Sequence, residues 1–295
     1  MLNRRRFLAL SACATALPAR AAPPVARWHG AAMGSAASLT LSGLDDHAAR
    51  PIFARVEAEL ARIEARFSLH RDSALTRLNR DGRLAFPDRQ ITDLFALAGR
   101  VHAATAGAFD PTVQPLWRAI AEGRDTGAAR ALIGWEGVEV SPAEIRLARP
   151  GMALTFNGIA QGHAADRIAD LLRAEGLRDV LVDMGEIAAM GQRPGGGPWR
   201  AQIVGPDGRP AGRLDLHDRA LATSAPAGTR IGPGGDAPHI LDPQAQRAPR
   251  WRLAAVAAPR AALADALSTA ACVMERAAIE AALAAFPGAT LVALA

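Results

Sequence analysis

Residues 155–186 read TFNGIAQGHAADRIADLLRAEGLRDVLVDMGE, and this stretch decides the fold class. It begins with a glycine-containing turn and continues as a helix that is predicted from about Gly162 to Glu175 and ends at Gly176. Val180-Leu181-Val182 follows as a buried strand that enters a second glycine turn. A stretch that joins a helix to a strand in this way indicates a fold with both kinds of element, and the spacing of the remaining elements shows how they combine.

Outside this stretch, helices and strands follow one another without a regular spacing. Ile52, Val56 and Leu60 recur at helical intervals, which predicts an amphipathic helix from Asp45 to Phe67. Further helices are predicted at 74–78, 91–105, 261–274 and 277–286, strands at 33–41, 199–204, 213–216 and 289–294, a hairpin at 138–154 and a loop at 107–115. No regular βαβ repeat links these elements, so the sequence predicts an α+β fold with a mixed sheet.

The N-terminus has the pattern of an export signal. Arg4 and Arg5 lie in the segment NRRRFL, and an apolar run follows from Phe7 to Leu17. Ala19-Arg20-Ala21 then resembles a cleavage site with small residues at its ends. This order of charge, apolar run and small residues predicts a twin-arginine signal peptide and a protein that works in the periplasm.

The signal also sets the predicted domain boundaries. Residues 1–21 are expected to be the signal peptide, and residues 22–295 are expected to form the functional domain. Cys13 offers an alternative, because the segment around it fits a lipoprotein processing site. In that case the protein would be anchored to the membrane through Cys13.

The charge balance does not indicate a nucleic-acid partner. The whole chain has 34 basic and 29 acidic side chains, a net charge of +5. Four of the arginines and none of the acids lie in residues 1–21, so removal of the signal leaves 30 against 29, or +1. A chain without a basic excess lacks the electrostatic footprint of nucleic-acid binding. No run of about 18 apolar residues predicts a transmembrane helix.

Four loop clusters carry the residues with chemical potential. They are MGS at 33–35, GAFDPTV at 107–113, NGIAQG at 157–162 followed by Asp166, and the pair HILDP at 239–243 and DALST at 265–269. Taken singly, each has a structural explanation, such as a turn, a glycine needed for backbone geometry or a polar flank on a helix. Taken together, they supply carboxylate, hydroxyl and backbone groups, which are the parts of a phosphate and metal site.

Asp265 and Thr269 indicate a divalent cation. They are four residues apart in a predicted helix, so their oxygens face the same side. Mg²⁺ prefers hard oxygen ligands and commonly takes few protein groups together with phosphate oxygens of a substrate. The chain has neither a Walker pattern nor a Gly-x-Gly-x-x-Gly after a strand, so it does not match two common nucleotide-binding folds.

The order of six motifs resembles the ApbE family of FAD:protein FMN transferases. The motifs are MGS, FSxxxxS from Phe67, GAFDPTV, NGIAQG, HILDP and DALST, and they run from Met33 to Met274. The resemblance implies an α+β fold with the flavin in a cleft between two parts of one compact unit. It also implies that Mg²⁺ assists the transfer of FMN from its substrate FAD to a Thr or Ser hydroxyl of a partner protein, with release of AMP.

The resemblance assigns roles to individual residues. Positions similar to the family's FAD contacts are Met33, His70, Ala108, Phe109, Asp110, Thr155, Gln161 and Ile240. Positions similar to its magnesium ligands are Gly158 and Ser268 through their carbonyls, Asp265 and Thr269. His239 stands where the family has a histidine important for transfer, and either His239 or Asp265 would take the proton of the acceptor hydroxyl.

The chain departs from the family pattern in three places. Thr155 and Gln161 stand where the family's D-L-S-A-I-A-K-G has Asp and Lys, so one acid and one base disappear together. That joint loss would leave the local charge unchanged if the two groups normally balance each other. His70 stands where a Tyr is usual, and Gly185-Glu186 replaces a pair of glycines.

These departures leave two alternatives to a transferase. One is a magnesium-dependent FAD pyrophosphatase, which would release FMN and AMP to water. The other is a periplasmic FAD-binding protein without turnover. The NGIAQG variant with a twin-arginine signal resembles family members associated with nitrous-oxide respiration. The expected partner is therefore a membrane-associated acceptor flavoprotein, and an electron-transfer protein of that respiration is a candidate.

Overall fold

The fold is built around one large antiparallel sheet. In the computed structural model, residues 23–244 and 247–295 are described, and the expected signal peptide with Cys13 lies outside these residues. The strands run in the order β1-β2-β6-β7-β10-β13-β14 across the sheet. Their bounds are β1 Val25–Ala32, β2 Ser35–Ser42, β6 Val180–Asp183, β7 Ile187–Met190, β10 Arg219–Ser224, β13 Ala254–Ala258 and β14 Thr290–Leu294.

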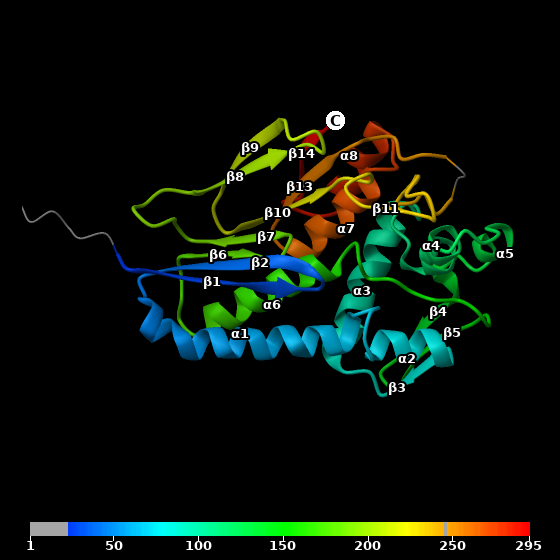
Figure 1. The fold of residues 1–295 in the computed structure, drawn as a ribbon, viewed down its shortest axis with the longest axis horizontal. Helices are drawn as coiled ribbons and strands as arrows, with labels where there is room; N and C mark the ends of the chain where they lie inside the picture. The colour runs from blue at the N-terminus through cyan, green and yellow to red at the C-terminus, as the bar shows by residue number, and fades with distance from the viewer. Residues whose placement is uncertain (1–22, 245–246) are drawn as a thin grey trace, which may run out of the picture.

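Helices cover one face of this sheet, as Figure 1 shows. They are α1 (Asp46–Phe67), α6 (Ala160–Ala174), α7 (Ala261–Ala271) and α8 (Arg276–Ala284). The buried positions of α1 recur at helical spacing, and the side chain of Asp45 accepts a hydrogen bond from the N–H of Ala48 at 2.8 Å. This cap fixes the start of the helix where the sequence predicts it. The apolar stripe of α1 packs into the main core of the protein.

Helices α6 and α7 cross at close range because Gly162 has no side chain. A Cβ at Gly162 would lie 2.3 Å from the carbonyl oxygen of Ala261, a distance that no real Cβ occupies. Asp166 strengthens the same contact by accepting hydrogen bonds from the N–H groups of Ala261 and Ala262 at 2.8 and 3.0 Å. The first turn of α7 is thereby held on α6, which brings two sequence motifs about a hundred residues apart into contact.

A hairpin covers the other face of the sheet. It consists of β8 (Trp199–Val204) and β9 (Pro210–Leu216), which project beyond the main sheet in Figure 1. Trp199, Ile203 and Leu216 form a second apolar cluster with residues of the sheet face that points away from the helices. The sheet is therefore buried between two layers.

The remaining elements form a small lobe at one end of the molecule, which is drawn at the right of Figure 1. It contains α2 (Ala74–Asp81), β3 (Arg83–Ala85), α3 (Arg89–Ala104), η1 (Pro111–Val113), α4 (Gln114–Ala121), α5 (Gly127–Arg130), η2 (Trp135–Gly137), β4 (Val138–Val140) and β5 (Glu144–Leu147). Strands β3, β5 and β4 pair in that order, and a short ribbon of β11 (Arg230–Ile231) with β12 (Ala237–Pro238) lies in the loop after β10. No helix in 23–244 or 247–295 is long and apolar enough to cross a membrane.

The α+β class predicted from the sequence is confirmed. In place of the mixed strand directions expected, all six pairings of the large sheet are antiparallel. The reason is that neighbouring strands are joined by hairpins or by long excursions that return in the opposite direction. Segment 107–115, expected to be a loop, contains η1 and the first residues of α4.

Candidate functional site

Asp265 is the central acidic residue of the α6–α7 contact. Its side chain is 3% exposed, and Oδ2 accepts a hydrogen bond from the N–H of Gly162 at 3.1 Å. Burial raises the pKa of Asp265 to about 7, the Gly162 N–H opposes this, and the negative charge of Asp166 adds to it. The NGIAQG and DALST motifs are therefore joined by a direct hydrogen bond.

Gly158 and Thr269 form the second contact between these two motifs. A Cβ at Gly158 would lie 2.9 Å from Thr269 Oγ1, so only glycine leaves room for the threonine hydroxyl at this point. Ser224, the last residue of β10, lies beside the same hydroxyl, with 3.3 Å between their oxygens. Its hydroxyl is 2.7 Å from that of Ser268, which is fully buried. Three of the predicted metal ligands are thus gathered with Asp265 around one end of α6.

Glu186 is an acidic group of this region that the sequence analysis did not place in the site. It directly precedes β7, is 6% exposed, and accepts a hydrogen bond from the N–H of Thr223 at 3.1 Å. Burial raises the pKa of Glu186 well above its usual range, and the negative charge of Asp265 raises it further. The sequence signal that could have placed Glu186 in the site is its departure from the family pattern, which has a glycine at this position.

Gln161 joins the turn between β1 and β2 to the turn between β6 and β7. Its Nε2 donates to Ser35 Oγ at 2.7 Å, across 126 positions of the chain. A Cβ at Gly185 would lie 2.7 Å from the same nitrogen, so the second turn also packs against Gln161. Met33 precedes Ser35 in the β1–β2 turn and has a positive φ of 49°, an uncommon conformation for a residue with a side chain.

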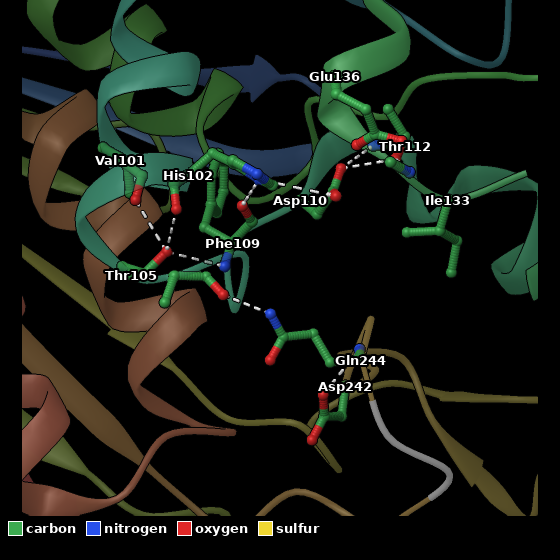
Figure 2. A network of polar contacts seen from close by, with 12 residues as sticks. Val101, His102, Thr105, Phe109, Asp110, Thr112, Ile133, Glu136, Asp242 and Gln244 are labelled. Carbon is green, nitrogen blue, oxygen red and sulfur yellow. Dashed lines mark hydrogen bonds and ion pairs between the residues drawn. The ribbon is translucent and has the colours of Figure 1, made fainter.

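The GAFDPTV segment is held by its own polar network, which Figure 2 shows. Asp110 Oδ1 accepts from the N–H of Thr112 at 2.8 Å and from its hydroxyl at 2.6 Å. His102 Nδ1 lies 3.0 Å from the carbonyl oxygen of Phe109 and 3.6 Å from Asp110 Oδ2. Burial raises the pKa of Asp110, while the Thr112 hydrogen bonds and His102 lower it. In this structure the carboxylate of Asp110 organises its own loop.

The GAFDPTV segment and the residue before it are tied to residues that flank two other motifs. The N–H of Thr155 donates to the carbonyl oxygen of Pro111 at 2.9 Å, which ties this loop to the segment before α6. The side-chain amide of Gln244 donates to the carbonyl oxygen of Ala106, as Figure 2 shows, which ties it to the segment that follows His239. Hydrogen bonds from residues that directly flank these motifs therefore tie the three segments together.

His239 is held through one of its two ring nitrogens. Nδ1 lies 2.9 Å from the carbonyl oxygen of Pro226 and 3.1 Å from that of Thr229. A carbonyl oxygen can only accept, so Nδ1 carries the proton in the neutral ring. Nε2 is then the nitrogen with the free lone pair, which is the form that a general base requires.

The other predicted FAD contacts lie at different depths. Phe109 is 5% exposed and packs into the main core, and Ala108 and Ile240 lie half-buried against that core. His70 is exposed in the loop after α1, and its backbone N–H donates to Ser68 Oγ at 3.1 Å. His70 forms no described hydrogen bond with residues of the α6–α7 contact. The role of His70 in FAD binding therefore stays a prediction.

The groups at the α6–α7 contact fit a hard divalent cation. They are a carboxylate, a hydroxyl and backbone carbonyls, and the bare Cα of Gly158 leaves the Thr269 hydroxyl accessible. Within 23–244 and 247–295, no three His, Cys, Asp or Glu side chains gather as a metal cluster. Hard oxygen ligands of this kind are those that Mg²⁺ accepts, together with water and phosphate oxygens of a substrate.

The fold is that of solved flavin transferases. The chain is similar to the flavinyl transferase ApbE of Pseudomonas stutzeri, with 29% identity, a TM-score of 0.75, and coverage of 89% of this chain and 88% of that one. It is similar to the flavin transferase ApbE of Vibrio cholerae, with 27% identity, a TM-score of 0.77, and coverage of 88% and 91%.

Sequence comparison agrees with the structural likeness. The model of the ApbE family matches residues 33–292, so the chain belongs to the ApbE family. A curated relative, the FAD:protein FMN transferase of Klebsiella pneumoniae, is 28% identical over 88% of this chain and 82% of its own length. The resemblance inferred from the six motifs is confirmed.

Proposed function

We propose that this protein is an FAD:protein FMN transferase that depends on Mg²⁺. The observation that carries the proposal is the meeting of Asp265 with Gly162 and of Thr269 with Gly158, which gathers hard oxygen ligands from two distant motifs. Membership of the ApbE family and the transferase names of the relatives support the same activity. FAD is the substrate that supplies the FMN group.

The reaction is a substitution at phosphorus. The oxygen of a Thr or Ser hydroxyl in the acceptor forms a bond to the phosphorus of the FMN half of FAD. The bond from that phosphorus to the bridging oxygen breaks, and AMP leaves with the electron pair. The hydroxyl proton passes to a base, and the product is an FMN phosphoester of the acceptor.

His239 is the base in this proposal. Its Nδ1 is held by the carbonyl oxygens of Pro226 and Thr229, which leaves Nε2 free to accept the hydroxyl proton. Asp265, Thr269 and the carbonyls of Gly158 and Ser268 would hold Mg²⁺. When bound, the ion supplies charge stabilisation for the pyrophosphate oxygens and the departing AMP.

We place this reaction in the periplasm, with a membrane-associated flavoprotein as the acceptor. The twin-arginine pattern at Arg4 and Arg5 supports export, and the NGIAQG variant supports an acceptor from nitrous-oxide respiration. Cys13 leaves open an anchored form of the transferase itself. Fractionation of cells that produce the full chain tests the location, and a mature protein confined to the cytoplasm would contradict it.

The direct test is a transfer assay. The protein is incubated with FAD, Mg²⁺ and a Thr-containing acceptor, which is then examined by flavin fluorescence in a denaturing gel and by mass spectrometry. We expect the acceptor to gain one FMN, and a chelator to prevent this. His239→Ala should lower the transfer rate by about 100- to 10,000-fold, the range for loss of acid–base catalysis, while FAD still binds.

The same assay separates the alternatives. Release of FMN and AMP without a labelled acceptor would identify an FAD pyrophosphatase. Binding of FAD without either product would identify a flavin-binding protein. Transfer by His239→Ala at the rate of the unaltered protein would assign the proton to another group, and Asp265 would be the next candidate.

A further inference from the structure

Glu186 and Asp265 are two buried carboxylates in one part of the protein. Asp265 is 3% exposed on α7, and Glu186 is 6% exposed directly before β7. Burial raises the pKa of Glu186, and the negative charge of Asp265 raises it further. A pair of like charges out of contact with water is unfavourable unless something compensates it.

The protein itself supplies little compensation. Within the described residues, the carboxylate of Glu186 accepts one hydrogen bond, from the N–H of Thr223. The carboxylate of Asp265 accepts one, from the N–H of Gly162. The charged groups that act on Glu186 within the described chain are the carboxylates of Asp265 and Asp183, and both are negative. Neither Glu186 nor Asp265 forms an ion pair with an Arg or His of segments 23–244 and 247–295.

The surroundings of Glu186 connect it to the proposed metal ligands. Its hydrogen-bond partner Thr223 precedes Ser224, whose hydroxyl lies 2.7 Å from that of Ser268 and 3.3 Å from that of Thr269. Gly185, the residue before Glu186, packs against the amide of Gln161. Glu186 is thus held between β10 and the start of α6, on the side of the sheet where Asp265 lies.

We propose that Glu186 is the second carboxylate of the divalent-cation site, and that with Asp265 it supplies the negative charge that holds the ion. This inference rests on the proposed function, because the cation is the one that the transfer requires. Two carboxylates match the charge of a divalent cation. The protein therefore binds Mg²⁺ before FAD arrives, whereas a site with one carboxylate depends more on the phosphate oxygens of the substrate.

The absence of charge on Gln161 agrees with this role of Glu186. Gln161 is neutral and lies against Gly185, next to Glu186. A cationic side chain at position 161 would lie close to Glu186 and compete with a metal ion for its charge. With a neutral amide there, the carboxylates of Glu186 and Asp265 remain available to the cation.

The test measures metal binding without FAD. Mn²⁺, which electron paramagnetic resonance detects when it is free, is titrated into the FAD-free protein and into Glu186→Gln, which keeps the shape and removes the charge. We expect the affinity for Mn²⁺ to fall by about 10- to 100-fold, the range for loss of a group that supports a metal site. The loss should be smaller when FAD is present, because phosphate oxygens then contribute ligands.

Glu59→Gln is the matched control. Glu59 is also 6% exposed, but it lies on α1 and pairs with Arg62 and Arg167 at 3.1 and 3.4 Å. Its substitution removes a buried carboxylate of the same kind away from the site, and Mn²⁺ affinity should not change. Glu186→Gly is the second variant, and it should lose the same affinity as Glu186→Gln if charge is what matters.

The outcomes distinguish this inference from the proposed function. An unchanged Mn²⁺ affinity in both Glu186 variants, with a weakened one in Asp265→Asn, would overturn the role of Glu186 alone. A protein that binds no Mn²⁺ with or without FAD would overturn the metal site as a whole. Thermal unfolding without metal provides the fold check, and Glu186→Gln should unfold at a temperature no lower than that of the unaltered protein.

Discussion

Two acidic groupings lie at or beside the contact between α6 and α7, and they are built in opposite ways. Asp166 accepts two backbone hydrogen bonds from the start of α7, and Asp170 forms two with the guanidinium of Arg260, at 2.8 and 2.7 Å. Arg260 also lies 3.4 Å from Asp166. Asp265 and Glu186 receive one backbone hydrogen bond each and no cation from the described chain.

The difference separates a structural role from a binding role. The first grouping carries its own counter-charge, so it is complete without a ligand and stabilises the helix contact. The second grouping concentrates negative charge in a buried place, which costs stability until a cation or protons compensate it. Proteins commonly accept such strain at functional sites, and this one has it at the position where we propose that the metal binds.

The largest effect is expected from Asp265→Asn, which removes charge from the second grouping. FMN transfer should fall by more than the roughly 100-fold that loss of a supporting group costs, because Asp265 is the proposed direct ligand. The unfolding temperature without metal should not fall, since a buried uncompensated charge has been removed. Flavin fluorescence of the acceptor and calorimetry check the two expectations. Transfer at the original rate would show that the grouping does not serve the reaction.

Asp166→Ala should have the opposite pattern. It removes the acceptor for two N–H groups of α7 and a partner of Arg260, and breaking a buried charged contact of this kind costs about 3–5 kcal/mol of unfolding free energy. Denaturant unfolding measures this loss. The affinity for Mn²⁺ at a temperature where the variant is folded should remain close to that of the unaltered protein. A stable variant that loses the metal would erase the distinction between the two groupings.

The smallest effect concerns His163, which lies on α6 near Arg167 and Arg260. Burial lowers the pKa of His163 to about 4, and Arg167 and Arg260 lower it further. In the unfolded chain the pKa is near 6.5, so below that pH the unfolded state binds a proton that the folded state refuses. Stability should therefore fall by about 2 kcal/mol between pH 6.5 and pH 5.

His163→Leu is the comparison for this pH dependence, because leucine fills the apolar position beside Phe67 without titrating. As the pH falls from 6.5 to 5, the unfolding free energy of the unaltered protein should decrease relative to that of His163→Leu. Parallel curves over that interval would show that His163 is protonated equally in both states, contrary to the effect of its burial.

The sequence predicted the local parts of this molecule well. The spacing of Ile52, Val56 and Leu60 defined α1, and Asp45 marked its first turn, because both signals lie within one element. Asp265 and Thr269 were predicted to share a helix side from their separation of four positions. Both indeed contact the NGIAQG segment, through Gly162 and Gly158 respectively.

The sequence was less informative where distant segments decide the outcome. Strand β13 reads AAVAA, a composition that suits a helix, and it becomes a fully buried strand only because β10 and β14 lie on either side. Strand β1 has no clean alternation of buried and exposed residues and was not predicted. Glu186 was read as a lost glycine, since its burial beside Asp265 depends on the pairing of β7 with β10.

The hydrogen bond from Gly162 to Asp265 spans 103 positions of the chain. During synthesis, α6 leaves the ribosome long before α7, so a growing chain contains NGIAQG without its partner carboxylate. Contacts of such long range form late in folding, after the loop between them has closed. The proposed metal site is therefore incomplete in the growing polypeptide, and binding of an ion there must await synthesis of the last fifth of the protein.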